Sequence, residues 1–82
     1  MSEIVLTRRA LKDLDKLDRP IRRRIIERLK EYSDDPTAHA SRLTDSLLGS
    51  FRFRIGDWRV LFDIIDDRVI VLRIGHRSDI YR

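Results

Sequence analysis

Residues 51–62 read FRFRIGDWRVLF, in which apolar side chains occupy every second position on both sides of Gly-Asp and arginines fill three of the intervening positions. Alternation with a period of two predicts strands that bury one face. A glycine that opens a two-residue loop is typical of a tight hairpin turn. We therefore predict a hairpin with these opposed pairs: Ile55 with Trp58, Arg54 with Arg59, Phe53 with Val60 and Phe51 with Phe62.

This register gathers the aromatic side chains on one face and sets Arg54 across from Arg59 on the other, with Arg52 two residues away. Like charges directly opposed in a sheet destabilise it by roughly 0.2–1 kcal/mol. The arginines are therefore either solvated outward residues or ligands of an anion. We favour the anion, because Arg supplies fifteen of the eighteen cations and Lys three, and a guanidinium fork matches phosphate geometry.

Upstream of this hairpin the apolar spacing becomes that of helices. Residues 4–6 are apolar and short enough for an opening strand, and Thr7 offers a hydroxyl that caps a first helix. The apolar residues of that helix are Ala10, Leu11, Leu14 and Leu17. Pro20 then opens a second helix, with an apolar stripe at Ile21, Ile25, Leu29 and Tyr32. The two helices form a hairpin with one apolar side.

Downstream, residues 69–75 form a nearly continuous apolar strand, as expected of a central strand covered on both faces. Residues 37–49 are irregular and polar, with three leucines as anchors on the core, at Leu43, Leu47 and Leu48. The order strand, helix, helix and three-strand meander gives an α+β fold, in which an antiparallel sheet packs on the helical hairpin. Eighty-two residues hold one domain, residues 1–82.

The sequence leaves open which face of the sheet Arg73 lies on. A two-residue turn at Asp66-Asp67 puts Arg73 on the aromatic face, whereas a three-residue turn puts it beside Leu61, with the other arginines. Four further arginines lie on the outer side of the second helix: Arg22, Arg23, Arg24 and Arg28. They either form a solvated helix face or make a second surface that binds a nucleic-acid backbone.

Composition narrows the function classes. A net charge of +4 and a pI near 10.1 suit a polyanionic partner. The absence of Cys excludes disulfides and thiol nucleophiles and favours a reducing, cytoplasmic setting.

Two distant histidines and scattered carboxylates give no metal-ligand spacing, so we expect no metal or other cofactor. No apolar run approaches the ~20 residues that cross a bilayer, and the N-terminus lacks the pattern of a signal peptide, so we expect no membrane partner.

The final segment, residues 75–82, brings an imidazole, a guanidinium, a carboxylate and a phenol together. Cleavage of RNA by its own 2′-hydroxyl needs a proton acceptor, a proton donor and cations around phosphorus. Imidazole exchanges protons near neutral pH, so His76 is a candidate for proton transfer. Tyr81 either stacks on a base or moves a proton, or it packs on the sheet edge.

Two runs, LGSFRFRIGDWRVLF at 48–62 and IGHRSDIY at 74–81, resemble the RelE/ParE toxin superfamily, and its RelE-like members most closely. The early ALKDL at 10–14, with Leu17, is similar to the first helix of that family. The resemblance implies the toxin of a type II toxin–antitoxin pair, with a cognate antitoxin protein as partner. RelE-like members are ribosome-dependent endoribonucleases that inhibit translation by cutting mRNA in the decoding site. They need no metal and leave a cyclic phosphate and a 5′-hydroxyl.

The resemblance also implies roles for individual residues. Arg52 and Arg54 stand where basic residues, often lysines, surround the scissile phosphate. Arg59 matches a phosphate-stabilising arginine in the next strand. Arg77 matches an arginine near the end of the chain, and Tyr81 matches a tyrosine that stacks on the substrate or helps to activate it.

Arginine replaces lysine at positions 52 and 54, and a guanidinium holds charge but is a poor proton donor. Proton transfer then falls to His76, to Tyr81 or to a group of the ribosomal RNA. Two other functions share the fold: a ParE-like inhibitor of DNA gyrase, and a non-catalytic antitoxin or nucleic-acid-binding partner. The arginines together with His76 and Tyr81 favour the endoribonuclease.

Overall fold

The computed structural model describes residues 2–44 and 49–81. In chain order its elements are β1 (Glu3–Leu6), α1 (Arg8–Asp15), α2 (Arg19–Tyr32), α3 (Pro36–His39), β2 (Ala40–Arg42), β3 (Phe51–Ile55), β4 (Trp58–Ile65) and β5 (Arg68–His76). The described residues form one sheet of order β1-β5-β4-β3-β2. The α+β fold and the β3-β4-β5 meander are confirmed, but the sheet is mixed, because β1 runs parallel to β5.

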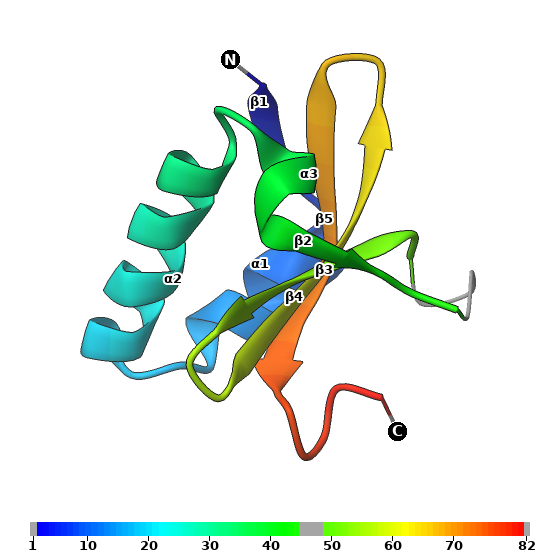
Figure 1. The fold of residues 1–82 in the computed structure, drawn as a ribbon. Coiled ribbons are helices and arrows are strands. Elements are labelled where there is room, and N and C mark those ends of the chain that lie inside the picture. The colour runs from blue at the N-terminus through cyan, green and yellow to red at the C-terminus, as the bar shows by residue number, and fades with distance from the viewer. Residues whose placement is uncertain (1, 45–48, 82) are drawn as a thin grey trace.

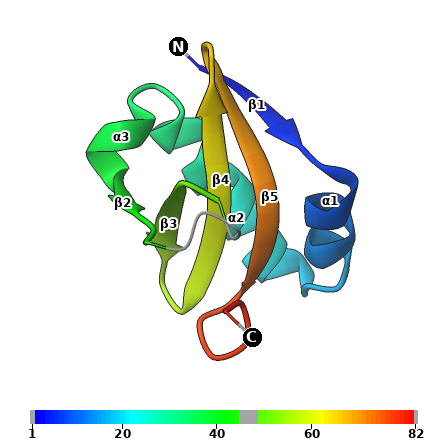
Figure 2. The same ribbon diagram turned by 90° about the vertical axis from the view of Figure 1, so that its right-hand side faces the viewer.

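The helices and the sheet form two layers. α2 runs along one face of the sheet, and the C-terminal end of the chain turns toward the opposite face (Figure 1). A view onto that opposite face shows α2 behind the strands and α1 beside β5 (Figure 2). We call the face opposite α2 the arginine face, because Arg52, Arg54 and Arg59 lie on it. None of the described helices has the length and apolar character needed to cross a membrane.

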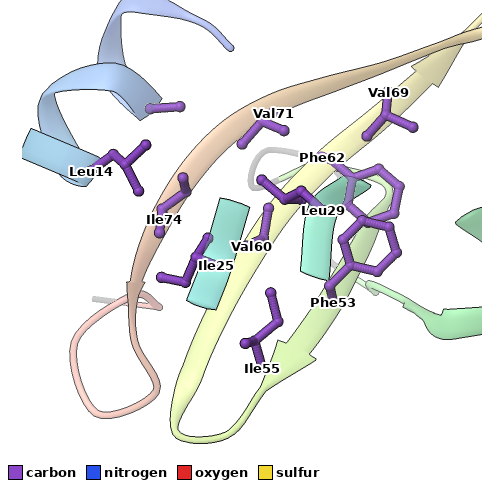
Figure 3. Packing of buried hydrophobic residues seen from close by; sticks show 11 residues of the cluster. Leu14, Ile25, Leu29, Phe53, Ile55, Val60, Phe62, Val69, Val71 and Ile74 are labelled. Atoms are coloured by element: carbon purple, nitrogen blue, oxygen red, sulfur yellow. The ribbon is translucent and has the colours of Figure 1, made fainter. Parts of the chain in front are cut away.

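The core lies between α2 and the sheet. Leu29 of α2 lies beside Phe62, Ile25 lies near Ile74, and all of these side chains are buried together with Phe53 (Figure 3). The ring centroids of Phe53 and Phe62 are 4.2 Å apart. Burying each such side chain contributes roughly 1.5–3 kcal/mol, so this cluster is the main source of stability.

The β3–β4 hairpin has the predicted register. All four predicted pairs are present: Phe51 with Phe62, Phe53 with Val60, Arg54 with Arg59 and Ile55 with Trp58. Gly56 has a φ of +61°, a left-handed value that glycine adopts without strain. The Gly56-Asp57 turn therefore fixes which side chains face the core and which face the other way.

Thr7 caps α1, as predicted. Its hydroxyl oxygen accepts from the Ala10 amide at 3.2 Å and donates to the Val71 carbonyl at 2.9 Å, so the cap also ties the helix to β5. The apolar face predicted for this helix needs one correction, because Leu11 is 47% exposed. The buried side of α1 carries Ala10, Leu14 and the carboxylate of Asp13 instead.

Residues 37–42 are more regular than predicted. Ala40–Arg42 forms the edge strand β2, which pairs with β3, and His39 before it stacks on the ring of Tyr32 at 4.4 Å. Leu43 is half-buried and is no member of the described core, while Leu47 and Leu48 lie outside the described residues.

β5 is central, as predicted, but it is not covered evenly on both faces. Val69, Val71 and Ile74 are buried in the core, whereas Ile70 and Leu72 are only half-buried. The prediction of a strand covered on both sides was therefore wrong in this respect, because α2 packs on one face of the sheet only.

A β-bulge decides the orientation of Arg73. The Asp66-Asp67 turn has two residues, since Ile65 pairs with Arg68, which by itself would put Arg73 on the aromatic face. The register then shifts at Leu61/Phe62, so that Arg73 lies opposite Leu61. Arg73 thus takes the second predicted position, through a bulge rather than a longer turn.

Asp13 closes the edge of β5 where β1 has ended. β1 pairs with residues 68–71 only, and α1 lies along the following part of β5. The Asp13 carboxylate accepts from the Ile74 amide at 3.0 Å and from the Arg73 Nε at 2.8 Å. Because this carboxylate is only 8% exposed, it satisfies two donors that would otherwise be unpaired near the core.

Asp13→Ala should lower the free energy of unfolding by about 2 kcal/mol, because the Ile74 amide and the Arg73 guanidinium lose their acceptor. Asp15→Ala on the same helix is the matched control, since Asp15 is exposed, and should change stability by less than about 0.5 kcal/mol. Urea unfolding followed by tryptophan fluorescence measures both. Equal effects from the two substitutions would contradict the role assigned to Asp13.

Candidate functional site

The arginine face is built from two rows of paired residues. Arg54 pairs with Arg59 on β4, and Arg59 pairs with Gly75 on β5. In the next row Arg52 pairs with Leu61. Neighbouring strands are about 4.8 Å apart, so the arginines of β3 and β4 leave the backbone close together and on one side. The convergence predicted from the alternating sequence is therefore present in the backbone.

None of these three guanidinium groups has a carboxylate partner among residues 2–44 and 49–81. Arg54 is exposed and free of any side-chain hydrogen bond within that same part of the chain. Arg59 is half-buried, and its Nη1 donates to the carbonyls of Gly56 and Trp58, both at 2.9 Å. These two carbonyls therefore orient the Arg59 guanidinium group without neutralising its charge.

Tyr81 lies against Arg52, although 29 residues separate them in the sequence. The Arg52 Nη1 donates to the phenol oxygen at 2.9 Å, and the guanidinium carbon is 5.9 Å from the ring centroid. The Arg52 Nε is buried without a hydrogen-bond partner among the described atoms. Tyr81 itself is 40% exposed, so its ring and hydroxyl are open to a ligand on the arginine face.

His76 lies on the other side of the sheet. It pairs with Trp58, and the two rings meet edge to face at 5.3 Å. Its Nδ1 is 2.8 Å from the Ser78 Oγ and 3.2 Å from the Ser78 amide nitrogen. The structure thus brings Arg52, Arg54, Arg59 and Tyr81 to one face and leaves His76 on the opposite one.

Arg73 and Arg77 are each engaged by an aspartate. Arg73 shares its row with Leu61, but its Nε is 2.8 Å from an Asp13 oxygen, in a partly buried ion pair. Arg77 lies 3.6 Å from an Asp57 oxygen, in an exposed pair of the kind that contributes little. In each of these arginines the Nε already contacts an aspartate oxygen of the protein, so only part of the guanidinium group is left for a ligand.

The arginines of α2 lie on the helix that packs on the other face of the sheet. Arg23 and Arg28 are exposed and Arg22 is half-buried, and α2 itself lies on the face of the sheet opposite the arginine face. Arg28 pairs with Glu31 at 3.2 Å.

Sequence reasoning missed Asp13 and Ile80. Nothing in a helical run of alternating charges marks Asp13 as the residue that faces β5. Ile80 is a single apolar residue in a polar tail, yet it is buried. The described residues contain no group of three or more His, Cys, Asp or Glu arranged to hold a metal ion.

The chain matches a family model described as the ParE toxin of the type II toxin–antitoxin system parDE, over residues 4–81. It is 37% identical over 79 residues to Toxin RelG of Mycobacterium tuberculosis, an alignment that spans 93% of this chain and 91% of the relative.

Two solved structures share the fold. A chain of the toxin–antitoxin complex RelBE2 from Mycobacterium tuberculosis superposes with a TM-score of 0.83 at 32% identity, covering 93% of this chain and 98% of that one. The isolated RelE toxin of E. coli superposes with a TM-score of 0.77 at 24% identity, covering 99% and 92%. The second likeness, at that identity, supports the fold alone.

Arg54→Gln should raise the free energy of unfolding by about 0.2–1 kcal/mol at low salt, because it removes a charge that opposes Arg59. The gain should vanish in molar salt, where the Debye length falls to about 3 Å. Arg68→Gln is the matched control, since Arg68 lies 3.6 Å from Glu3 at the other end of the sheet and should show no gain. Urea unfolding at the two salt concentrations measures the difference, and a salt-independent effect would contradict the repulsion.

Proposed function

The chain belongs to the ParE toxin family of type II toxin–antitoxin systems, within the RelE/ParE superfamily, and we propose that it is a toxin that cleaves mRNA in the ribosomal decoding site. One observation carries the proposal: Arg54 and Arg59 are paired on one face with no internal carboxylate partner in the described chain. A phosphodiester in contact with both forks would remove their repulsion and gain charge-assisted hydrogen bonds.

In the proposed reaction the 2′-hydroxyl of the RNA attacks the adjacent phosphorus. The bond from phosphorus to the 5′ oxygen breaks, which leaves a 2′,3′-cyclic phosphate on one fragment and a 5′-hydroxyl on the other. Negative charge accumulates on the non-bridging oxygens in the transition state. Arg54 and Arg59 stabilise that charge, and Arg52 adds a third cation at the Tyr81 side of the face.

Tyr81 supplies the proton for the leaving 5′ oxygen. Its phenol oxygen accepts a hydrogen bond from Arg52, which leaves the phenol proton available for donation. Arginine cannot take this role, since it keeps its proton at physiological pH. Because His76 lies on the opposite face, we assign the acceptor of the 2′-hydroxyl proton to a group of the ribosome, which would make cleavage depend on the ribosome.

Other arginines contribute at longer range. Arg22 and Arg23 on α2 would bind backbone phosphates of ribosomal RNA, on the side of the toxin away from the cleaved strand. Arg28 would add less, because Glu31 already pairs with it. Arg73 and Arg77 each form an ion pair with an aspartate, so they would raise the positive potential near the phosphate without binding the phosphate directly.

We assign an antitoxin protein as the second partner. RelBE2, the solved relative described above, is a toxin–antitoxin complex. An apolar groove runs between β1 and α2 and is lined by Ile4, Leu6, Ile26, Leu29 and Lys30. β1 is at the end of the sheet, so its free edge could accept an added strand while the groove receives apolar side chains.

Arg54→Gln should reduce mRNA cleavage about 10²- to 10³-fold, the loss typical of removing one donor that stabilises transition-state charge. The same substitution is expected to stabilise the free fold, so a loss of activity would not reflect unfolding. Arg59→Gln should lose activity to a similar extent, and Arg68→Gln should keep it. Primer extension on translated mRNA after brief induction measures the cuts.

Antitoxin binding should be unchanged in the Arg54 and Arg59 variants, because the groove is on the other side of the sheet. Intact messages together with altered DNA supercoiling would overturn the proposal in favour of gyrase inhibition. Variants that lose antitoxin binding and keep their toxicity would contradict the assignment of the site.

A further inference from the structure

Leu61 and Ile80 are buried, yet both lie outside the main core. Leu61 is 0% exposed although β4 directs it toward the arginine face, and Ile80 is 3% exposed although it belongs to the last turn of the chain. Neither is part of the cluster between α2 and the sheet. The C-terminal segment leaves the end of β5 and turns toward the side away from α2 (Figures 1 and 2).

The Ile80 side chain rests directly on Gly75. A Cβ at Gly75 would lie 2.9 Å from the Ile80 Cδ1 and 3.5 Å from its Cβ. Because Gly75 pairs with Arg59, that Cβ would point to the arginine face, and Ile80 therefore packs there. The φ of Gly75 is not positive, so what opposes a side chain at this position is the space that Ile80 occupies and not the backbone conformation.

His76 accepts the hydrogen bonds that stabilise the turn containing Ile80. Its carbonyl accepts from the amides of Asp79 and Ile80 at 2.9 and 3.0 Å. On its side chain, Nδ1 lies 3.2 Å from the Ser78 amide. A backbone N–H only donates, so Nδ1 is the acceptor, and we assign the ring proton to Nε2. The Nδ1 atom of His76 therefore already serves as a hydrogen-bond acceptor within the turn.

We propose that Gly75, His76, Ser78 and Ile80 form a C-terminal clasp that positions Tyr81 against Arg52, which makes Ile80 and His76 positioning residues for the cleavage reaction. The proposal rests on the proposed function. Ile80 is the buried residue directly before the exposed Tyr81, so its packing on Gly75 sets where the Tyr81 backbone lies. The clasp would hold the Tyr81 phenol oxygen 2.9 Å from the Arg52 Nη1.

Three variants test the anchor. Gly75→Ala places a methyl group in the space of the Ile80 Cδ1 and should reduce cleavage about 10- to 100-fold, since small displacements of a catalytic group have costs of this size. Ile80→Val deletes the Cδ1 atom and should have a small effect alone. The double variant should recover most of the activity that Gly75→Ala loses. A double variant no better than Gly75→Ala would overturn the clasp.

A second comparison separates positioning from general stability. In a Tyr81→Ala background the clasp has nothing to position, so adding Gly75→Ala should cause no further loss of cleavage. A purely structural role would give losses that multiply, because independent effects on folding add in free energy. Multiplying losses would therefore contradict the proposal.

Two substitutions test His76. In His76→Asn the amide oxygen can replace Nδ1 as the acceptor for Ser78, so cleavage should stay near the wild-type level. His76→Leu lacks an acceptor and should lose cleavage about as strongly as Gly75→Ala. If His76→Asn loses as much as His76→Leu, the imidazole transfers a proton in the reaction and its positioning role is wrong.

Hydrogen exchange reports on the clasp without any activity measurement. The Asp79 and Ile80 amides should be protected in the wild type and exchange faster in Gly75→Ala, while Phe53 and Phe62 stay protected in both. Faster exchange in a protein that never cuts mRNA would retain the clasp and reject the endoribonuclease. Unchanged protection of the Ile80 amide in Gly75→Ala would reject the clasp, whatever the activity.

Discussion

The pairing of Arg54 with Arg59 across β3 and β4 is the constraint on which the candidate site depends. Opposed cations cost roughly 0.2–1 kcal/mol, whereas each large side chain buried on the other face contributes roughly 1.5–3 kcal/mol. A slip of one residue would move Phe53 and Phe62 out of the core, so the hairpin cannot relieve the repulsion by changing register. Core packing thus holds two unneutralised charges in a place where an anion can bind between them.

The sequence was sufficient to predict this hairpin, because the Gly56-Asp57 turn and the alternating side chains point to the same register. It was also sufficient for the cap at Thr7 and for the two main helices. It was insufficient for β2, since three residues are too few to establish a period of two. The position of Arg73 depends on a bulge at Leu61/Phe62, which is a property of two strands together and leaves no mark on either one.

At the site, sequence reasoning identified the residue types better than their partners. The alternation put Arg52, Arg54 and Arg59 on one face, but it could not show that Tyr81 would reach Arg52. That contact depends on Ile80 packing on Gly75, a match of shapes between two small segments. His76 was the natural candidate for proton transfer from its chemistry alone. Its placement opposite Trp58 became visible only in three dimensions.

Cryo-electron microscopy of this toxin on a ribosome tests the role of Arg54 and Arg59 most directly, with a decoding-site codon that carries 2′-O-methyl groups to block attack on phosphorus. We expect one phosphate of that codon to lie within hydrogen-bond distance of the guanidinium groups of Arg54 and Arg59, with the Tyr81 hydroxyl facing its 5′ oxygen. A complex in which the mRNA contacts the arginines of α2, while Arg54 and Arg59 face solvent, would contradict it.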